Sequence, residues 1–420
     1  MTGLSFLALL ILGVPIAFAL IAFAMVMIWA GGNPILFQSL PQQLFGGLEN
    51  YGLLALPLFI LLGELMNAGG IGRRLMAFAL ALLGPVRGGL AHVNLLANMM
   101  MASILGSTVA QITVMSRVAV PEMERAGYPR DVSVAITAAG GMLAPIIPPS
   151  MMFIIFGVIA QLPIGDLFIA GIVPGVILSG AFLAVIGWLG RRQGFPRSER
   201  LSLPARLRAA RDALPAALIP ASIIGAILGG IATPTESAAV ASVLAVLIGR
   251  FVYRELAWAD LWPAFIRAGT YSAVVLFLIA AAGLFSWVIT FANLPALVSD
   301  RLQGMTASPL VFLLLVNLML LVLGMVTDPI PAIILVVPVF LPVAVGVYGI
   351  DPFQFGVIVC LNLTAGLLTP PVGTGLFAAA MTGGVRAERL AWLILPFFLA
   401  VTGVLALLAL FPPLTLWLIR

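Results

Sequence analysis

Two parts of this 420-residue chain place glycine, proline and polar side chains inside otherwise apolar sequence. The first runs from Leu105 to Gln111 and is followed by TAAGGMLAPIIPPS at 137–150. The second runs from Gly324 to Pro331 and is followed by NLTAGLLTPPVGT at 362–374. Glycine and proline end helices, and unpaired backbone at membrane depth is tolerated only where protein or a polar cavity surrounds it. Each part therefore predicts a re-entrant hairpin with an unwound partner helix.

Such breaks have a chemistry of their own. The N-terminus of a half-helix directs partial positive charge at an anion, and unwound carbonyls with hydroxyl oxygens form sites for Na⁺. Breaks at matched positions of two repeats are typical of the midplane site of a secondary transporter. The alternative is that glycine and proline only kink packed membrane helices. Two matched segments favour transport.

Composition agrees with a membrane protein, because 62% of the residues are hydrophobic and only 8% are charged. All 20 basic residues are arginines that lie between apolar runs, which excludes nucleic-acid binding as an explanation of the basic charge. One cysteine and one histidine exclude a disulfide framework and a His/Cys metal cluster. The sequence contains no Ser/His/Asp set and no HExxH motif, so we do not expect an enzyme.

Apolar runs long enough to cross a hydrocarbon core of about 30 Å recur along the chain. The first of them has no basic segment before it and no small-residue cleavage site, so we expect a retained span rather than a signal peptide. The amphipathic segments 33–49 and 254–268 predict helices along the membrane interface. The expected spans lie near 4–30, 51–67, 88–105, 131–160, 165–191, 213–231, 236–253, 269–291, 309–323, 353–381 and 389–418.

The two halves of the chain match at an offset of about 218 to 225 residues, which indicates internal duplication. Gly141–Pro145 falls on Gly366–Pro370, and Val93–Leu95 on Val316–Leu318. Arginines distinguish the equivalent loops, since 31–50 has none whereas 250–268 has three. The positive-inside rule then places equivalent loops on opposite sides, as an inverted repeat requires.

The stretch 191–211, with seven arginines, joins the halves and should be cytoplasmic. The N-terminus is then cytoplasmic and Arg420 periplasmic.

In six motifs the chain resembles a known family: LGVPIAFAL, GELMNAGGIGRRL, APIIPPS, TPTES, GMVTDPIPA and LLTPPVG. It is similar to the large, DctM-like permease subunit of tripartite ATP-independent periplasmic (TRAP) transporters. The resemblance implies an all-α polytopic protein of the bacterial inner membrane, with an inverted repeat, two re-entrant hairpins and an elevator mechanism. It also implies Na⁺ as the coupling ion, a small four-helix membrane subunit, and a periplasmic solute-binding protein that delivers an organic acid.

The resemblance also implies that the chain divides into five parts. The first half should contain scaffold helices with a first interfacial arm at 1–67 and a transport-domain half with the first hairpin at 68–191. After a cytoplasmic basic linker at 192–212, the second half should contain scaffold helices with a second arm at 213–291 and a transport-domain half with the second hairpin and closing helices at 292–420. The alternative function is a Na⁺/dicarboxylate symporter of similar architecture that works without a binding protein.

The family's first hairpin reads S-G-S-x-x-A-D, whereas this chain has Leu105 for the leading serine and Gln111 for the acid. The second hairpin keeps its acid as Asp328, which either serves the site or only caps the next helix. The substrate contacts implied by the resemblance are Ser107, Thr108, Gln111, Pro148, Pro149, Ser150, Asp328 and Thr374. The implied Na⁺ ligands are Gly106, Ser107, Gly141, Pro145, Gly324, Thr327, Thr364, Gly366 and Thr369.

Three further charged residues allow two readings each. Arg117 could clamp a carboxylate or extend to the interface. Glu236 has the spacing of a capping box after Thr233, or could contact the transport domain. Glu64, close to Asn67, is open to the same two interpretations.

Overall fold

The computed structural model describes residues 6, 8–9, 12–82, 88–105, 107–196, 202–370 and 372–420, and the regular elements among them are helices. The first half contains α2 (Ile16–Ala30), η1 (Pro34–Ser39), α3 (Leu40–Gly46), η2 (Tyr51–Leu54), α4 (Ala55–Ala68), α5 (Ile71–Leu82), α6 (Gly89–Leu105), α7 (Thr108–Arg125), α8 (Arg130–Gly141), α9 (Met151–Ala160) and α10 (Ile164–Gln193). The second contains α11 (Leu203–Leu228), α12 (Pro234–Leu247), η3 (Ile248–Val252), α13 (Trp258–Phe291), α14 (Leu294–Met305), α15 (Pro309–Val326), α16 (Pro329–Gly346), α17 (Pro352–Leu367), α18 (Thr374–Gly383), α19 (Ala387–Leu410) and α20 (Pro413–Leu416).

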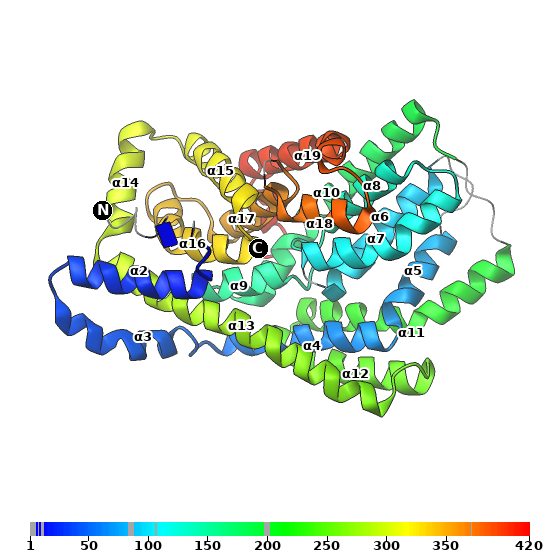
Figure 1. Ribbon diagram of the computed structural model, residues 1–420, viewed down its shortest axis with the longest axis horizontal. Coiled ribbons are helices and arrows are strands. Elements are labelled where there is room, and N and C mark those ends of the chain that lie inside the picture. Colours follow the sequence, from blue (N-terminus) through cyan, green and yellow to red (C-terminus); the bar gives the residue numbers. More distant parts are fainter. Residues whose placement is uncertain are drawn as a thin grey trace.

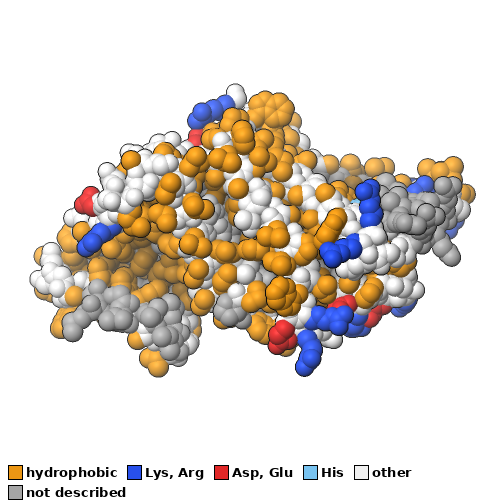
Figure 2. All heavy atoms as spheres, turned by 90° about the horizontal axis from the view of Figure 1, so that it is seen from above, with side chains coloured by type: hydrophobic (Ala, Val, Ile, Leu, Met, Phe, Trp, Pro, Cys, Tyr) orange, Lys and Arg blue, Asp and Glu red, His pale blue; other side chains and the backbone are white. Residues whose placement is uncertain are grey.

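Eight helices of the described chain are long and apolar enough to cross a membrane. Their outer faces are apolar as well: Leu310, Leu314 and Leu318 follow one face of α15 and stay exposed. Figure 2 shows hydrophobic side chains spread across the face in view, with charged side chains gathered toward its margins. An exposed apolar surface of this extent suits a lipid environment. The polytopic all-α prediction is confirmed.

The helices form two groups that lie against each other (Figure 1). The long helix α13 packs against α2, α3 and α4, α12 packs against α4, and α11 packs against α12 and α5. We call α2, α3, α4, α11, α12 and α13 the α13 layer. The other group, the hairpin body, consists of α6–α10 and α15–α20. Helix α5 touches both α11 and α6 and so joins the two groups on one side.

The hairpin body contains the repeat seen in the sequence. The first hairpin is α6 with α7, and its partner helix is broken into α8 and α9; the second is α15 with α16, and its partner is broken into α17 and α18. The halves are interleaved, because α9 packs against α16 and α18 packs against α7. Each broken helix thus contacts the hairpin of the other half, an arrangement that fits the expected inverted repeat.

The broken partner helices are confirmed, because the stretches 131–160 and 353–381 are each two helices. Other expected boundaries are wrong. The second interfacial arm at 254–268 is not a separate helix, since α13 runs unbroken through Gly269 for about 50 Å. Its counterpart in the first half does break after Gly46, where α3 ends and a short 3₁₀ helix leads into α4.

Other differences concern the ends of elements. The first span, expected at 4–30, is interrupted, since residues 12–15 are not helical and α2 begins at Ile16 directly after Pro15. The basic linker expected at 192–212 is helical from Leu203 onward, since Ser202 accepts a hydrogen bond from the Ala205 N–H and caps α11. Helices α5 and α14 were not expected as elements. The functional division into scaffold and transport parts stays a prediction.

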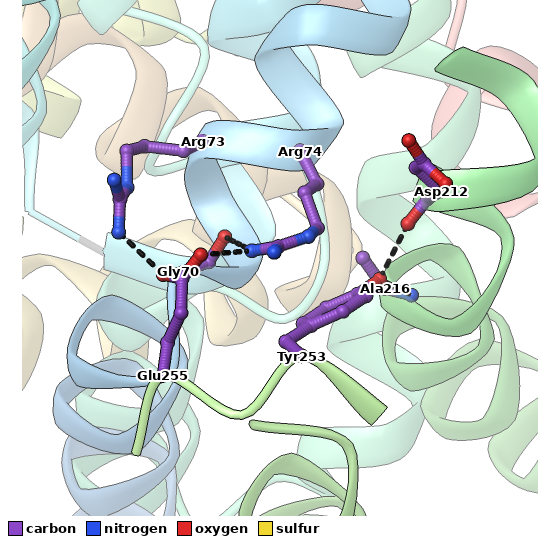
Figure 3. Close-up of polar contacts among 7 residues, drawn as sticks. All are labelled: Gly70, Arg73, Arg74, Asp212, Ala216, Tyr253 and Glu255. Carbon is purple, nitrogen blue, oxygen red and sulfur yellow. Dashed lines mark hydrogen bonds and ion pairs between the residues drawn. The ribbon is translucent and has the colours of Figure 1, made fainter. Parts of the chain in front are cut away.

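A polar cluster fastens α5 to the α13 layer (Figure 3). Arg73 and Arg74 both pair with Glu255, and the Arg74 guanidinium lies 3.8 Å from the centre of the Tyr253 ring. The Tyr253 hydroxyl donates to the carbonyl oxygen of Asp212 at 2.8 Å and accepts from the Ala216 N–H at 3.0 Å. Burial raises the pKa of Tyr253, so the hydroxyl keeps its donor proton at neutral pH. The Tyr253 hydroxyl therefore links two backbone groups that lie one turn apart in α11, next to Pro215.

Candidate functional site

The first hairpin turns between α6 and α7. Ser107 is the N-cap residue of α7, but its side chain accepts no capping bond, so its hydroxyl is free to face a ligand. Thr108 follows in the first turn and is buried. Gly106, an expected Na⁺ ligand, lies outside the described residues. The tip therefore presents the start of α7 with Ser107 at its end.

Gln111 points away from the tip into the protein. Its Nε2 donates to the backbone oxygen of Asn98 at 2.8 Å and to the Asn98 side-chain oxygen at 3.0 Å. Asn98 in turn donates to Asn94, and Asn94 donates to the Thr137 hydroxyl at 2.7 Å. Gln111 is fully buried, and its Oε1 has no partner among the described residues. The structure thus places this expected substrate contact in a buried amide network.

The second hairpin turns at Thr327 and Asp328. Asp328 is the N-cap residue of α16, and its Oδ1 accepts from the Ile330 N–H at 3.1 Å. The Thr327 hydroxyl donates to the Leu323 carbonyl at 3.1 Å. The capping reading of Asp328 is therefore part of the structure, while its second carboxylate oxygen remains available for another role. The side chain is exposed at the tip.

The first broken helix is fixed by its own side chains. Gly141 ends α8, and a Cβ there would lie 2.5 Å from Ile112 of the hairpin, so the two elements touch closely. The Ser150 hydroxyl donates to the Pro145 carbonyl at 2.5 Å and accepts from the Phe153 N–H at 3.4 Å, which caps α9. The bond between Pro148 and Pro149 is cis. The two hydrogen bonds of Ser150 thus fix the start of α9.

The second broken helix touches the second hairpin partly through close backbone contacts, in addition to the Asn362 side chain, which donates to the backbone and side-chain oxygens of Asn317. A Cβ on Gly366 would lie 2.7 Å from the Gly324 Cα, and a Cβ on Gly324 would lie 2.7 Å from the Leu363 carbonyl oxygen. The Gly373 N–H donates to the Met325 carbonyl at 3.0 Å. Only glycine permits an approach of this kind. Carbonyl oxygens of both elements consequently gather between α17 and α18.

Three threonines near this break differ in what their hydroxyls do. Thr364 donates to the Cys360 carbonyl at 2.7 Å and Thr369 to the Ala365 carbonyl at 2.8 Å, so both bond their own chain four residues back. Each oxygen still has lone pairs with which to accept or ligate. Thr374 begins α18 with an exposed side chain.

A cavity of about 340 Å³ lies where the hairpin tips face the α13 layer. Ser107 and Ala110 of the first tip line it together with Ile330 of the second. Pro149, Met151 and Ile154 add the start of α9. The opposite wall is made by residues of α4 and α13, namely Phe59, Ile60, Gly63, Glu64, Asn67, Tyr271 and Val275.

The N-termini of α7, α9 and α16 therefore meet at one cavity, although they belong to both halves of the sequence. A helix N-terminus carries roughly half a positive charge, so their convergence favours an anionic ligand. Of the expected substrate residues, Ser107 and Pro149 line the cavity. The other expected residues are not among its lining residues, namely Thr108, Gln111, Pro148, Ser150, Asp328 and Thr374. Arg117 is exposed on α7 and is also absent from the lining.

The wall formed by α4 and α13 was not expected from the sequence. Tyr271 was not considered from the sequence, and Glu64 and Asn67, which lie in the family motif GELMNAGGIGRRL, were not predicted as cavity residues. Glu236, by contrast, behaves as its spacing predicts, because Thr233 and Glu236 close a capping box at the start of α12. No group of three or more His, Cys, Asp or Glu side chains within the described residues could hold a metal ion.

The family model and the related sequences identify the same protein family. Residues 4–414 match the family described as "Tripartite ATP-independent periplasmic transporter, DctM component". A 2,3-diketo-L-gulonate TRAP transporter large permease protein of Escherichia coli is 37% identical, with 96% of this chain and 94% of that protein aligned. A sialic acid TRAP transporter large permease protein of Vibrio cholerae is 36% identical over 98% and 96% of the two chains.

A solved structure shares the fold. The crystal structure of the Alcanivorax borkumensis YdaH transporter superposes with a TM-score of 0.67 at 15% identity, covering 91% of this chain and 89% of that one. At this identity the likeness concerns the fold alone.

The contact between Gly324 and Gly366 leads to a first prediction. Gly366→Ala places a methyl group against backbone atoms of the hairpin. This backbone cannot move aside as a flexible side chain would. We expect a destabilisation of about 1 to 3 kcal/mol, measured as a lower midpoint of thermal unfolding in detergent. The matched control is Gly403→Ala in α19, where a Cβ meets nothing within 4 Å and should stabilise the helix slightly. Equal midpoints for both variants would contradict the close contact.

Proposed function

Because this chain belongs to the DctM family of TRAP transporter components, we propose that it is the large permease subunit of a Na⁺-coupled transporter that imports an organic acid. The observation that carries the proposal is the convergence of three helix N-termini, from both hairpin tips and one broken helix, on a single cavity. We assign no catalytic step to the chain, since binding and movement are sufficient for transport.

The substrate class rests on charge and on the relatives. Relatives named for 2,3-diketo-L-gulonate, sialic acid and C4-dicarboxylates all have acids as their named substrates. In this chain Ser107 offers a hydroxyl, and the α7 and α9 N-termini offer backbone N–H groups and partial positive charge. A carboxylate placed between the hairpin tips would use these donors. We therefore propose a small organic acid as the substrate.

Na⁺ is proposed as the coupling ion, and the second break fits it. A Cβ built on Gly373 would lie 2.8 Å from the Thr369 carbonyl oxygen and 2.9 Å from that of Leu367, so oxygens surround a space that glycine leaves open. Alkali ions prefer such oxygen ligands. Gly324, Thr327, Thr364, Gly366 and Thr369 would hold the ion at the second break, and Ser107, Gly141 and Pro145 at the first. When bound, Na⁺ supplies positive charge beside the substrate carboxylate.

The two helix groups suggest how the acid crosses the membrane. The cavity lies between the hairpin body and the α13 layer, so a movement of one group against the other would carry the substrate with the hairpins. We propose that this is an elevator-type movement in the bacterial inner membrane. A small four-helix membrane subunit and a periplasmic solute-binding protein complete the proposed transporter.

Uptake by the complete transporter in proteoliposomes tests this function. We expect import of at least one of succinate, sialic acid and 2,3-diketo-L-gulonate to require external Na⁺ and to vanish when K⁺ replaces it. Omitting the binding protein should abolish import as well. Undiminished import without the binding protein would instead identify a binding-protein-independent Na⁺/dicarboxylate symporter. Import with neither Na⁺ nor the partner would refute the proposal.

Asp328→Asn separates the two roles of Asp328. Asparagine caps helices about as well as aspartate, so the start of α16 should be retained. A charge that serves the site is lost, and we expect uptake to fall about tenfold or more with unchanged expression. Asp351→Asn is the control for loss of a capping charge, because Asp351 caps α17 through the Phe353 N–H. Asp351 also pairs with Arg420 at 2.8 Å, so this control loses an ion pair as well. If Asp328→Asn transports like this control, Asp328 is only a cap.

A further inference from the structure

Among the described residues that line the cavity, Glu64 is the one with a charged side chain. It lies on α4 one turn before Asn67, which lines the same wall. A carboxylate at this position would repel an anionic substrate unless a cation compensates for it. The wall that faces the hairpin tips therefore needs a positive partner.

That partner is Arg267 of α13. Its Nε donates to the Glu64 Oε2 at 2.7 Å. Arg267 precedes Tyr271 by one helical turn, so it projects from the same side of α13 as a lining residue, although Arg267 itself is not among the residues that line the cavity. The Arg267 side chain is 49% exposed and that of Glu64 is 21% exposed. The guanidinium is thus half exposed and lies directly beside Glu64, which does line the cavity.

Only one edge of this guanidinium is used. Nε bonds Glu64, whereas the two terminal nitrogens have no partner within the described part of the chain. The guanidinium is planar and offers five donors, so its outer edge can hold a second carboxylate bidentately while Glu64 keeps the inner one. Glu64 then fixes the orientation of Arg267, and the terminal nitrogens remain for a ligand.

Stability alone explains the pair poorly. A half-exposed ion pair contributes about 0 to 1 kcal/mol, and an ionisable pair within a membrane span generally faces a cavity or a pathway. The other arginines near this end of α5 are already engaged, since Arg73 and Arg74 both pair with Glu255. Among the described residues, the cation that pairs with Glu64 is Arg267 and not Arg117, the cation considered from the sequence.

We propose that Arg267 is a carboxylate-binding residue on the α13 layer, which receives the carboxylate of the substrate across the cavity from the hairpin tips. Glu64 is the positioning residue that holds the guanidinium in place. The proposal rests on the proposed function insofar as the substrate is an organic acid. It adds a binding residue on the wall that the hairpins face, where sequence motifs indicate none.

A thiol reporter inside the cavity tests the proposal independently of transport. Asn67→Cys introduces the reporter, because Asn67 is exposed and lines the wall, while the native Cys360 is completely buried. The complete transporter is placed in lipid nanodiscs, and the labelling rate of the reporter by an uncharged maleimide is measured. The probes are succinate, sialic acid and 2,3-diketo-L-gulonate, with uncharged succinamide as the control.

We expect at least one acid to slow labelling and succinamide to leave it unchanged. Arg267→Gln should raise the half-protecting concentration about tenfold or more, because a charge-assisted bidentate contact is lost. Arg267→Lys should fall between the two, since it keeps the charge and loses the planar fork. Glu64→Gln should lower the half-protecting concentration, because it removes a negative charge and keeps an oxygen that accepts from Nε.

The double variant Glu64→Gln with Arg267→Gln decides between binding and mere neutralisation. A binding role for Arg267 predicts that the double variant regains only the part of the loss that comes from the unpaired Glu64 carboxylate, and still protects clearly more weakly than the reporter parent. Recovery to the level of the reporter parent would refute it, as would protection by succinamide or by no acid at all. If Arg267→Gln leaves protection unchanged while uptake depends on Na⁺, the binding role of Arg267 is refuted and the proposed function stands. If protection depends on Arg267 but uptake does not depend on Na⁺, the proposed Na⁺ coupling is refuted and the binding role of Arg267 stands.

Discussion

A polypeptide that breaks its helices inside a hydrocarbon layer must pair the exposed backbone groups with other parts of the protein. This constraint explains most of the contacts around the cavity. Ser150 bonds the Pro145 carbonyl, Asp328 caps α16, and the Gly373 N–H bonds the Met325 carbonyl of the other element. Ser150 and Asp328 each fix the start of their own helix, and the bond from Gly373 to Met325 joins the second broken helix to its hairpin. The proposed anion binding depends on helix starts held in this way.

The two halves meet this constraint differently. In the first half a chain of buried amides runs from Gln111 through Asn98 and Asn94 to Thr137. The Gln111 amide donates to oxygens of Asn98, which a carboxylate at that position could not do unless it were protonated. A neutral amide also costs far less to bury than a charge. The acid of the second tip, Asp328, has no counterpart at the first tip, so the repeat is chemically asymmetric.

The sequence predicted the parts of the fold that follow from glycine, proline and polar residues in apolar runs. Both hairpins and both broken partner helices were found in this way, and the capping box at Thr233 followed from spacing alone. The unbroken course of α13 was missed because no residue near Gly269 signals continuity or a break. Asn67 and Tyr271 were missed as cavity residues because their role depends on which helices face each other, and periodicity does not report that.

The central claim is that the hairpin tips move past the α13 layer as the substrate crosses. Asn67 on α4 and Ile330 at the second tip line the same cavity from opposite groups, and Cys360 is buried, so two introduced thiols can be joined selectively. The decisive measurement is Na⁺-driven uptake by the variant Asn67→Cys with Ile330→Cys after treatment with a cleavable bifunctional maleimide that spans the cavity. If the hairpin tips must move past the α13 layer, cross-linking stops uptake and cleavage of the linker restores it. Unchanged uptake through the cross-linked protein would contradict this movement.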